Sequence, residues 1–484
     1  MAQKQRKQVN YALITSEAVF LILCLWAIWN QSYSAPVDVG DPDPDGYTSY
    51  SARLQEHFEV DRDYRRYPGY PVFIIFANFI FPMIDSIPPG DIHEPVHILQ
   101  TMVCLVFALG FYLFVRHAWG IMIAWLSLAI LASPNFLVLF TSYPFADFLY
   151  GIGWACCFGY LFYWVRDRQN VPSWSALVVF IFSILVLQLV KPNAATMLAF
   201  FSLGLVPTFL LVPSKFRDSF EFTKGILIKS GIMLVIAIAV AILVPFFFGD
   251  GPIRFVVWAA KTRIVYYLPP ASQSSVEMKI EAGKADWQLK HGQKIEDVNF
   301  TPGQSEIRFN WVDQVWLQRL EAHPLQYIGV TLNELLRKHY LIIDQYVPFF
   351  ANTDNALYVN ILPRSQSAES RLYRSTGLMV DPLGEGKVAF ARVSRAVIRL
   401  VLFWALLLIG WWKLFSESQV YVVGMTICAI LYIILHAATV FIDGRYMLAF
   451  AVPLYVTQAV GLATLTRFIA ISDIAKKSLA DTGF

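Results

Sequence analysis

Long, uninterrupted apolar runs restrict what this chain can fold into. The first extends over 11–29, and further runs of spanning length follow at 95–115, 119–138, 144–164, 174–190, 193–212, 225–247, 394–412, 418–438 and 447–469. About 20 consecutive apolar residues make a helix long enough to cross a bilayer. Because 57% of the 484 residues are hydrophobic and only 15% are charged, these runs exceed the needs of a soluble core. The sequence predicts an all-α polytopic membrane protein with about ten transmembrane helices.

The basic residues predict how these helices are oriented. Basic residues at 4–7 precede the first run, whose length of roughly 19 residues exceeds the apolar core of a secretory signal. We therefore interpret it as an uncleaved anchor. With ten spans, the basic positions within 116–117, 166–168, 215–224 and 476–477 fall on the side of the N-terminus, as the positive-inside rule requires. Both termini are predicted to be cytoplasmic.

The apolar segment 69–88 has two interpretations. Prolines near its two ends, at Pro71 and Pro82, leave about ten uninterrupted residues, fewer than the roughly 20 needed to span. If it nevertheless spans, every later basic loop moves to the outer face, against the positive-inside rule. We expect an interfacial or re-entrant helix here, with a spanning helix as the alternative.

This topology also predicts how the chain is organised. The outer face would carry the loop 31–94, the turn 133–147, Lys191-Pro192-Asn193, the segment 248–393 and the turn 443–446. We predict a transmembrane core at 1–248, an extracytoplasmic lid or small domain at 249–393, and C-terminal transmembrane helices with a cytoplasmic tail at 394–484. The lid contains a predicted amphipathic helix at 324–340.

Acidic residues gather in the first outer loop. Asp43 and Asp45 flank Pro44, which keeps both carboxylates out of a regular helix until after Gly46. One carboxylate could act as general base toward an acceptor hydroxyl while the other orients it or helps to hold a divalent cation, Mg²⁺ or Mn²⁺. A solvated acidic turn is the plainer alternative. Asp147 begins the fourth run, where an acid is also favoured by the helix dipole alone.

A second set of outer-face residues is basic. It consists of Arg65, Arg66, Lys191, Arg337, Lys338, Arg395, Arg399 and Arg445. Basic groups of this kind, and the planar fork of arginine above all, favour a phosphate-bearing ligand. Any single one could instead be an anchor at the lipid headgroups. Lys191 and Arg445 stand out because each lies in a short outer turn, where the positive-inside rule disfavours basic residues.

The sequence excludes nucleic-acid binding, and its cysteines and histidines do not support a metal site. A net charge of +3 is too small for a nucleic-acid-binding protein. The five cysteines lie inside apolar runs and have no metal-ligand spacing with a histidine. His93 and His97 share a helix face but lack a third ligand. No glycine-rich loop of a nucleotide-binding domain is present.

Seven short motifs follow one another along the chain, and their order is informative. They are the acid pair followed by Tyr47 and Ala52, Arg66-x-Pro68-x-Tyr70-Pro71, Arg116-His117-Ala118-Trp119-Gly120, Ser133-Pro134 through Asp147, Lys191-Pro192, Glu321 through Tyr327, and Arg445-Tyr446. Their order and shared sidedness resemble the GT-C superfamily of integral-membrane glycosyltransferases, especially the bacterial branch near the protein O-mannosyltransferases and the lipid A aminoarabinose transferases. That family often has Asp-Glu where this chain has Asp43-Pro44-Asp45. Asp43 keeps the four-residue spacing to Tyr47 that is seen in the lipid A branch, so the resemblance favours Asp43 as the base.

The resemblance implies a GT-C-like enzyme of a bacterial inner membrane whose site faces the periplasm. It would transfer a sugar from a polyprenyl-phosphate donor to a hydroxyl of a glycan, lipid or protein acceptor, with inversion. Asp43, Asp45 and Asp147 would be catalytic; Lys191, Arg445, Arg395 and Arg66 would bind the donor phosphate; Tyr47, Tyr70 and His339 would contact the acceptor or sugar.

Two other functions stay open. A polymerase or ligase of lipid-linked polysaccharide would act at the same face, but on an oligosaccharide carried by a diphosphate. A glycolipid transporter or flippase would place ionisable residues at mid-membrane in broken or repeated helices. The runs of this chain are nearly free of charge, which favours an enzyme.

Overall fold

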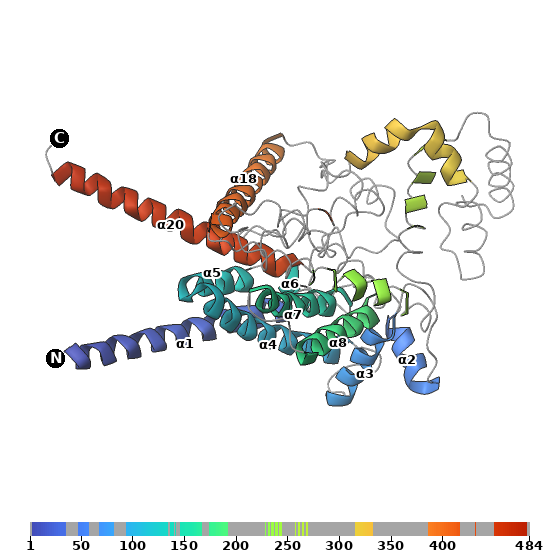
Figure 1. Cartoon of the computed structure of the whole chain (residues 1–484), viewed down its shortest axis with the longest axis horizontal. Helices are drawn as coiled ribbons and strands as arrows, with labels where there is room; N and C mark the ends of the chain where they lie inside the picture. Colours follow the sequence, from blue (N-terminus) through green and yellow to red (C-terminus); the bar gives the residue numbers. More distant parts are fainter. Residues whose placement is uncertain are drawn as a thin grey trace. The chain divides into compact units, whose positions relative to one another are not determined.

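The computed structural model describes residues 2–34, 47–57, 67–81, 93–133, 136–139, 141, 146–166, 174–191, 315–332, 386–416 and 450–481, with scattered positions in 228–269 and residue 431. Its helices are α1 (Ala2–Ser34), α2 (Tyr47–His57), α3 (Gly69–Ile80), α4 (His93–Trp119), α5 (Ile121–Ala132), α6 (Phe136–Leu139), α7 (Ala146–Arg166), α8 (Trp174–Val190), α18 (Gly386–Ser416) and α20 (Ala451–Asp481) (Figure 1). None of the residues in these ranges is in a strand. The all-α prediction is confirmed for this part of the chain.

The chain divides into two compact units. One contains Met1–Asp250, Tyr340–Tyr432 and Asp443–Phe484, and the other contains Gly251–His339 and Ile433–Ile442. All the labelled helices belong to the first unit. The three-part division expected from the sequence stays a prediction.

Two of the helices are long and apolar enough to cross a membrane when only the described ranges are searched. They are Ile14–Ser32 within α1 and Pro95–Trp119 within α4. Shorter apolar helices lie at Gly69–Ile80, Ile121–Ala132, Phe148–Cys157 and Val401–Ser416. The expected spans 193–212, 225–247 and 418–438 lie outside the described residues, apart from isolated positions. The count of ten spans therefore stays a prediction.

The expected run 119–138 is not one continuous helix, because α5 ends at Ala132, where the expected outer turn 133–147 begins. Gly120 adopts φ 92°, a conformation that favours glycine, and separates α4 from α5. Ser133 is extended, with φ −73° and ψ 160°, since the proline that follows it disfavours helical backbone at this position. The run is thus divided into α5 and the short helix α6.

Helices α1, α4 and α5 run in alternating directions. Near the start of the apolar part of α1 (Ile14–Ser32), Glu17 contacts Arg116 at the end of α4. Near the end of α1, Ser32 contacts His97 at the start of α4. Gln31 donates a hydrogen bond to the carbonyl oxygen of Ala132 at the end of α5. This alternation is the one expected of consecutive spans.

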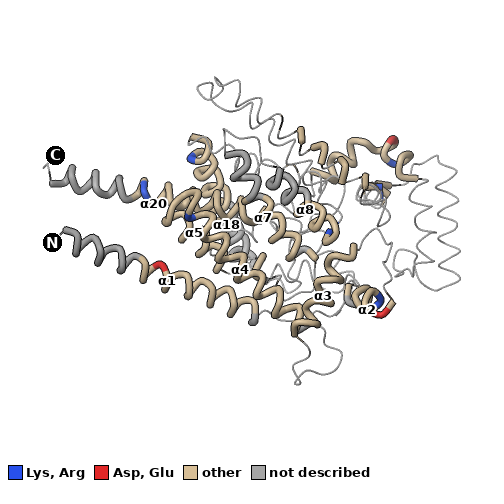
Figure 2. The backbone as a smooth tube through the Cα atoms, turned by 60° about the horizontal axis from the view of Figure 1, so that its bottom comes forward, with Lys and Arg blue, Asp and Glu red and all other residues tan. Residues whose placement is uncertain are grey.

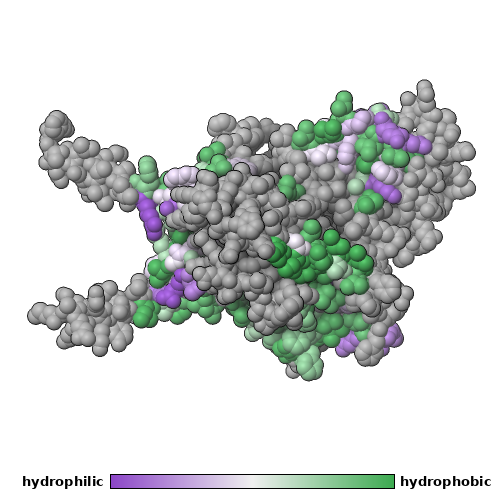
Figure 3. Space-filling model, viewed as in Figure 1, coloured by the Kyte–Doolittle hydropathy of each residue, from purple (hydrophilic) through white to green (hydrophobic). Residues whose placement is uncertain are grey.

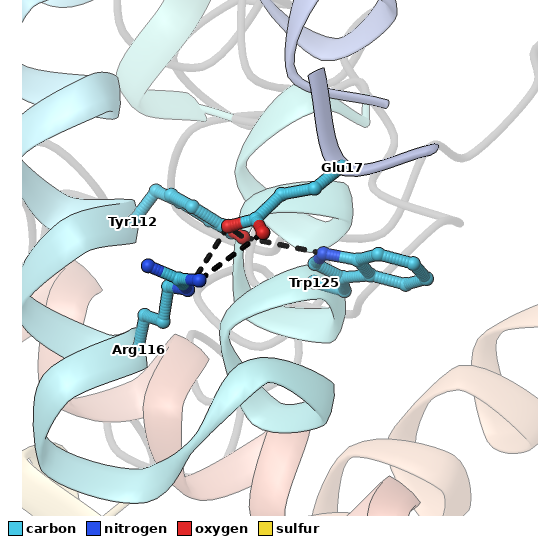
Figure 4. Close-up of polar contacts among 4 residues, drawn as sticks. All are labelled: Glu17, Tyr112, Arg116 and Trp125. Carbon is cyan, nitrogen blue, oxygen red and sulfur yellow. Dashed lines mark hydrogen bonds and ion pairs between the residues drawn. The ribbon is translucent and has the colours of Figure 1, made fainter. Parts of the chain in front are cut away.

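A polar cluster joins α1, α4 and α5 at the end that carries Glu17 (Figure 4). The Tyr112 hydroxyl donates to the Glu17 carboxylate over 2.5 Å, and Arg116 Nη2 donates to the same carboxylate over 3.2 Å. Trp125 Nε1 donates to the Tyr112 hydroxyl over 3.2 Å. The Glu17 side chain is only 12% exposed, so these donors replace the water that a carboxylate requires.

Glycines allow α18 and α20 to cross at close range. A Cβ atom at Gly410 would collide with the backbone carbonyl of Thr457, and one at Gly461 would collide with the carbonyl oxygen of Leu406. Small residues at such crossings are characteristic of helices that pack in membranes, where close backbone approach supplies the attraction. The first turns of α20 are buried as well, and α20 also packs against α5.

Large apolar side chains cover much of the exposed surface. Ile22, Phe79 and Val106 are 65%, 81% and 73% exposed, and Figure 3 shows extended hydrophobic areas among the described side chains. Charged residues are few along the described helices (Figure 2). Soluble proteins rarely expose apolar areas of this extent, whereas helices that face lipid do so as a rule.

The second unit contains a buried arginine that binds backbone. Arg319 lies in the helical segment 315–322 and is 4% exposed. Its Nη1 donates to the carbonyl oxygens of Val265 and Leu268 over 2.6 and 3.0 Å. Lys261 lies over the Trp316 ring, 5.4 Å from its centroid. Of the amphipathic helix expected at 324–340, the described part, 324–332, is helical.

Candidate functional site

Polar and aromatic side chains from several helices meet at one end of the first unit. We call this set the outer-end cluster; it comprises Ser32, Tyr47, Tyr70, His97, Gln100, Thr101, Thr141, Tyr150 and Lys191. It lies at the end of α1 and the start of α4, opposite the Glu17 cluster. All its members except Lys191 are at most 8% exposed. Buried polar groups in otherwise apolar helices are costly and mark places where function or specific packing requires them.

Tyr47 and Tyr70 begin a chain of contacts that leads into the bundle. Their rings pack edge to face with centroids 5.0 Å apart. The Tyr70 hydroxyl donates to Gln100 Oε1 over 3.1 Å, and Gln100 Nε2 donates to the carbonyl oxygen of Thr141 over 2.9 Å. The start of α2, the start of α3 and the segment after α6 are thereby fixed on α4.

The sequence of α3 explains why it lies where it does. Pro71 is tolerated because the first turn of a helix leaves its N–H groups without helical partners. One face, with Tyr70, Ile74 and Ala77, is buried, while Phe76 and Phe79 are exposed on the other. Its 12 residues span about 18 Å, short of the roughly 30 Å of a bilayer core, which supports the interfacial interpretation of this segment.

Gly69 brings the start of α3 against the end of α8. A Cβ atom here would lie 2.7 Å from the carbonyl carbon and oxygen of Leu189 and 2.8 Å from the nitrogen of Val190. Only glycine allows this approach. The tyrosine of the Arg66-x-Pro68-x-Tyr70 motif is therefore next to the helix end that carries Lys191.

Lys191 directly follows α8 and reaches toward α7. Its N–H donates to the carbonyl oxygen of Leu187 over 2.9 Å, and its Nζ lies 5.7 Å from the centroid of the buried Tyr150 ring. A cation is favoured both over an aromatic face and at a helix C-terminus. These contacts alone could explain why Lys191 is at this position. They also hold its ammonium group near the start of α7, the helix that begins with Ala146 and Asp147.

The predicted site residues fall into three groups. Tyr47, Tyr70 and Lys191 belong to the outer-end cluster. The backbones of Asp147 and Arg395 are placed in the first turn of α7 and in α18. Asp43, Asp45, Arg66, Arg445 and His339 lie outside the described residues. Among the side chains that the structure describes, no group of three or more His, Cys, Asp or Glu could hold a metal ion, and a cation at Asp43 and Asp45 stays a prediction.

Sequence reasoning missed the part of the cluster that lies on α4. His97, Gln100 and Thr101 share one helix face at i, i+3 and i+4 spacing. A polar face at the start of an apolar run was the available signal. His97 was considered only as half of a metal pair, whereas its Nε2 lies 3.0 Å from the carbonyl oxygen of Ser32.

Comparison with known proteins yields structural similarity alone. No family model and no curated protein matches the chain. The fold is similar to the oligosaccharyltransferase AglB from Archaeoglobus fulgidus in complex with an inhibitory peptide and a dolichol-phosphate, with a TM-score of 0.47 and 13% identity over 95% of this chain and 51% of that one. The apo form of the Archaeoglobus fulgidus oligosaccharyltransferase gives 0.45 and 12% identity, over 96% and 52%.

A third similar structure is ArnT from Cupriavidus metallidurans bound to undecaprenyl phosphate, with a TM-score of 0.36 and 15% identity over 92% of this chain and 78% of that one. All three are GT-C membrane glycosyltransferases, the superfamily that the motif order resembles. The chain spans about half the length of the two oligosaccharyltransferases. At TM-scores below 0.5 these similarities carry no argument about the activity of this chain.

Proposed function

We propose that the chain transfers a sugar from a polyprenyl-phosphate donor to an acceptor hydroxyl at the outer face of the membrane, with inversion at the anomeric carbon. The observation that supports the proposal is that Tyr47 packs on Tyr70, while Gly69, beside Tyr70, lies against the end of α8 that Lys191 follows. These residues come from segments far apart in the sequence. The same cluster holds Ser32, in the last turn of α1, and Tyr47, the first residue of α2, and these two helix ends lie on either side of the acidic segment 35–46.

The cluster suits a displacement at a phosphate-linked sugar. Asp43 or Asp45 takes the proton of the acceptor hydroxyl, whose oxygen then forms a bond to the anomeric carbon. The bond from that carbon to the phosphate oxygen breaks, and the electron pair leaves with the polyprenyl phosphate. The Lys191 ammonium stabilises the departing phosphate. Attack opposite the leaving group inverts the anomeric carbon.

The surroundings of Lys191 favour a donor carried by a lipid. The start of α3 touches the end of α8 through Gly69, and α3 exposes Val72, Phe76 and Phe79 on its outer side. An isoprenoid chain can lie along such an apolar face while its phosphate reaches the ammonium group. A water-soluble nucleotide sugar would gain nothing from this surface.

The test uses the full chain in lipid nanodiscs. Radiolabelled polyprenyl-phosphate mannose, glucose and aminoarabinose are offered with a cell-envelope extract as acceptor source, beside an oligosaccharide on polyprenyl diphosphate. Transfer from a monophosphate donor, with inversion seen by NMR of the product, supports the proposal. Transfer from the diphosphate alone assigns a polymerase or ligase instead, and movement of intact glycolipid without transfer assigns a transporter.

Substitutions at the two aspartates test whether transfer depends on their carboxylates. Asp43→Asn and Asp45→Asn test the two candidate bases, and at least one of them is expected to lower transfer by about 10³-fold or more. Glu56→Gln is the matched control, because this acid of α2 is 69% exposed and lies away from the acidic pair in sequence. Full activity in both aspartate variants would refute the site.

A further inference from the structure

One turn of α4, from His97 to Thr101, contacts Ser32 before the acidic segment 35–46 directly and is connected to Tyr47 after it through Tyr70. We propose that this turn is a clamp that fixes the two ends of that segment, and that His97 is a positioning residue for transfer. The inference rests on the proposed function for its catalytic meaning. The clamp itself is inferred only from contacts between described residues.

The first end of the segment is fixed at Ser32. His97 Nε2 lies 3.0 Å from the carbonyl oxygen of Ser32. A carbonyl oxygen can only accept, so Nε2 carries the hydrogen. Ser32 lies in the last turn of α1, where the carbonyl groups have no helical partner. His97 therefore closes the end of α1 two residues before the chain leaves the helix at Ser34.

Hydrogen bonds between hydroxyl groups also hold Ser32, and their donors and acceptors can be assigned consistently. Thr141 Oγ1 donates to the carbonyl oxygen of Val138 over 2.7 Å, so it must accept from Ser32 Oγ. Ser32 Oγ in turn accepts from Thr101 Oγ1 over 2.5 Å. Ser32, Thr101 and Thr141 are at most 1% exposed, so water does not compete with these bonds.

The second end of the segment is fixed at Tyr47, the first residue of α2. The Tyr47 ring packs on Tyr70, whose hydroxyl donates to Gln100, three residues after His97. Gln100 also donates to the carbonyl oxygen of Thr141. Thr141 thus joins the two ends, because its hydroxyl group binds Ser32 and its carbonyl group binds Gln100.

A clamp of this kind affects geometry more than donor affinity. A displacement of about 1 Å at a reacting group can lower a rate by roughly 10²-fold, whereas the groups that bind the donor phosphate are left in place. Loss of the clamp is therefore expected to lower kcat while the donor KM changes little. A part-buried bond at the far end of α4, from Tyr112 to Glu17, holds the same two helices but touches neither end of the segment.

The experiment compares four variants in nanodiscs. His97→Leu removes the donor to Ser32, and His97→Gln replaces it with an amide that can donate in the same place. Gln100→Leu loosens the second end. Tyr112→Phe is the control for a lost buried hydrogen bond on α4. Hydrogen exchange of peptides covering 28–34 and 47–52 is measured beside transfer from polyprenyl-phosphate mannose, or whichever monophosphate donor proves active.

We expect His97→Leu to speed exchange at 28–34, Gln100→Leu to speed it at 47–52, and each to lower kcat about 10-fold or more with donor KM within about 3-fold. His97→Gln restores both readouts, and Tyr112→Phe alters neither. Exchange unchanged in both leucine variants, or kcat losses equal to that of Tyr112→Phe, would overturn the clamp. If His97→Leu does not fold, Thr101→Val takes its place with the same criteria.

The two proposals fail in distinguishable ways. If the wild-type chain transfers no sugar from any donor, the proposed function fails, and the exchange measurements alone still decide whether the clamp exists. If transfer is observed and depends on the acidic residues but not on His97 or Gln100, the function stands and the positioning role is refuted.

Discussion

Arg116 Nε of α4 lies 2.9 Å from Glu17 Oε1 of α1, and this ion pair holds the two helices together at the end opposite Ser32 and His97. Arg116 is 47% exposed whereas Glu17 is 12% exposed, so the pair lies at the margin of the apolar part of the bundle. Polar contacts thus fix both ends of the apolar part of α1, Ile14–Ser32, on α4.

Loss of Arg116 should therefore destabilise the fold. Arg116→Leu leaves the buried Glu17 carboxylate with the Tyr112 hydroxyl alone, and we expect a loss of about 1–3 kcal/mol, below the value of a fully buried pair because Arg116 is half exposed. The double variant Glu17→Leu with Arg116→Leu should recover part of this loss. Thermal unfolding in nanodiscs measures both, and a double variant no more stable than Arg116→Leu would contradict the pairing.

Lys191→Met tests the proposed stabilisation of the departing phosphate. We expect kcat to fall by about 10²–10³-fold, the usual effect of removing one donor to a developing negative charge. Lys191→Arg should keep much of the activity, because a guanidinium group also binds phosphate. Lys413→Met, in the last turn of α18, is the control for the same change in charge. Equal activity in Lys191→Met and Lys413→Met would remove Lys191 from the site.

Gly69→Ala tests the contact between α3 and α8. The added methyl group would lie 2.7 Å from the Leu189 backbone, and separating the helices should cost about 1–3 kcal/mol. It should also lower transfer, because Tyr70 and Lys191 would move apart. Gly110→Ala is the matched control, since nothing lies within 4 Å of a Cβ atom at that position of α4. Similar thermal stability and activity in the two alanine variants would show that the contact is not as close as described.

The helical class and the shared location of Tyr47, Tyr70 and Lys191 could be predicted from the sequence. Apolar runs of spanning length are strong signals, and residues in outer turns are brought to one face by alternation of the helices. The breaks at Gly120 and Ser133 coincide with the turns expected at 116–120 and 133–147, and only the extension of the apolar run to 138 goes beyond the end of α5.

The α4 part of the cluster could not be predicted in the same way. His97, Gln100 and Thr101 acquire their roles from partners on α1, α3 and the segment after α6, and no local pattern specifies those partners. The ion pair between Glu17 and Arg116 is similar, because an acid near the start of an apolar run and a base near the end of another meet only once the helices pack. Hydrophobic periodicity predicts the helices, but it does not predict which side chains of different helices contact each other.

The proposed sidedness makes a prediction that is independent of any activity. Position 147 is in the first turn of α7, at the end that carries Lys191, whereas His117 is at the opposite end of α4, beside Arg116. In cells, a membrane-impermeant maleimide should label Asp147→Cys from outside and His117→Cys only after permeabilisation. The wild-type chain is the background control, because the exposed Cys156 lies within an apolar helix where a polar reagent has no access. Labelling of position 147 only after permeabilisation would place the outer-end cluster in the cytoplasm, where nucleotide sugars are available and the argument for a lipid-linked donor fails.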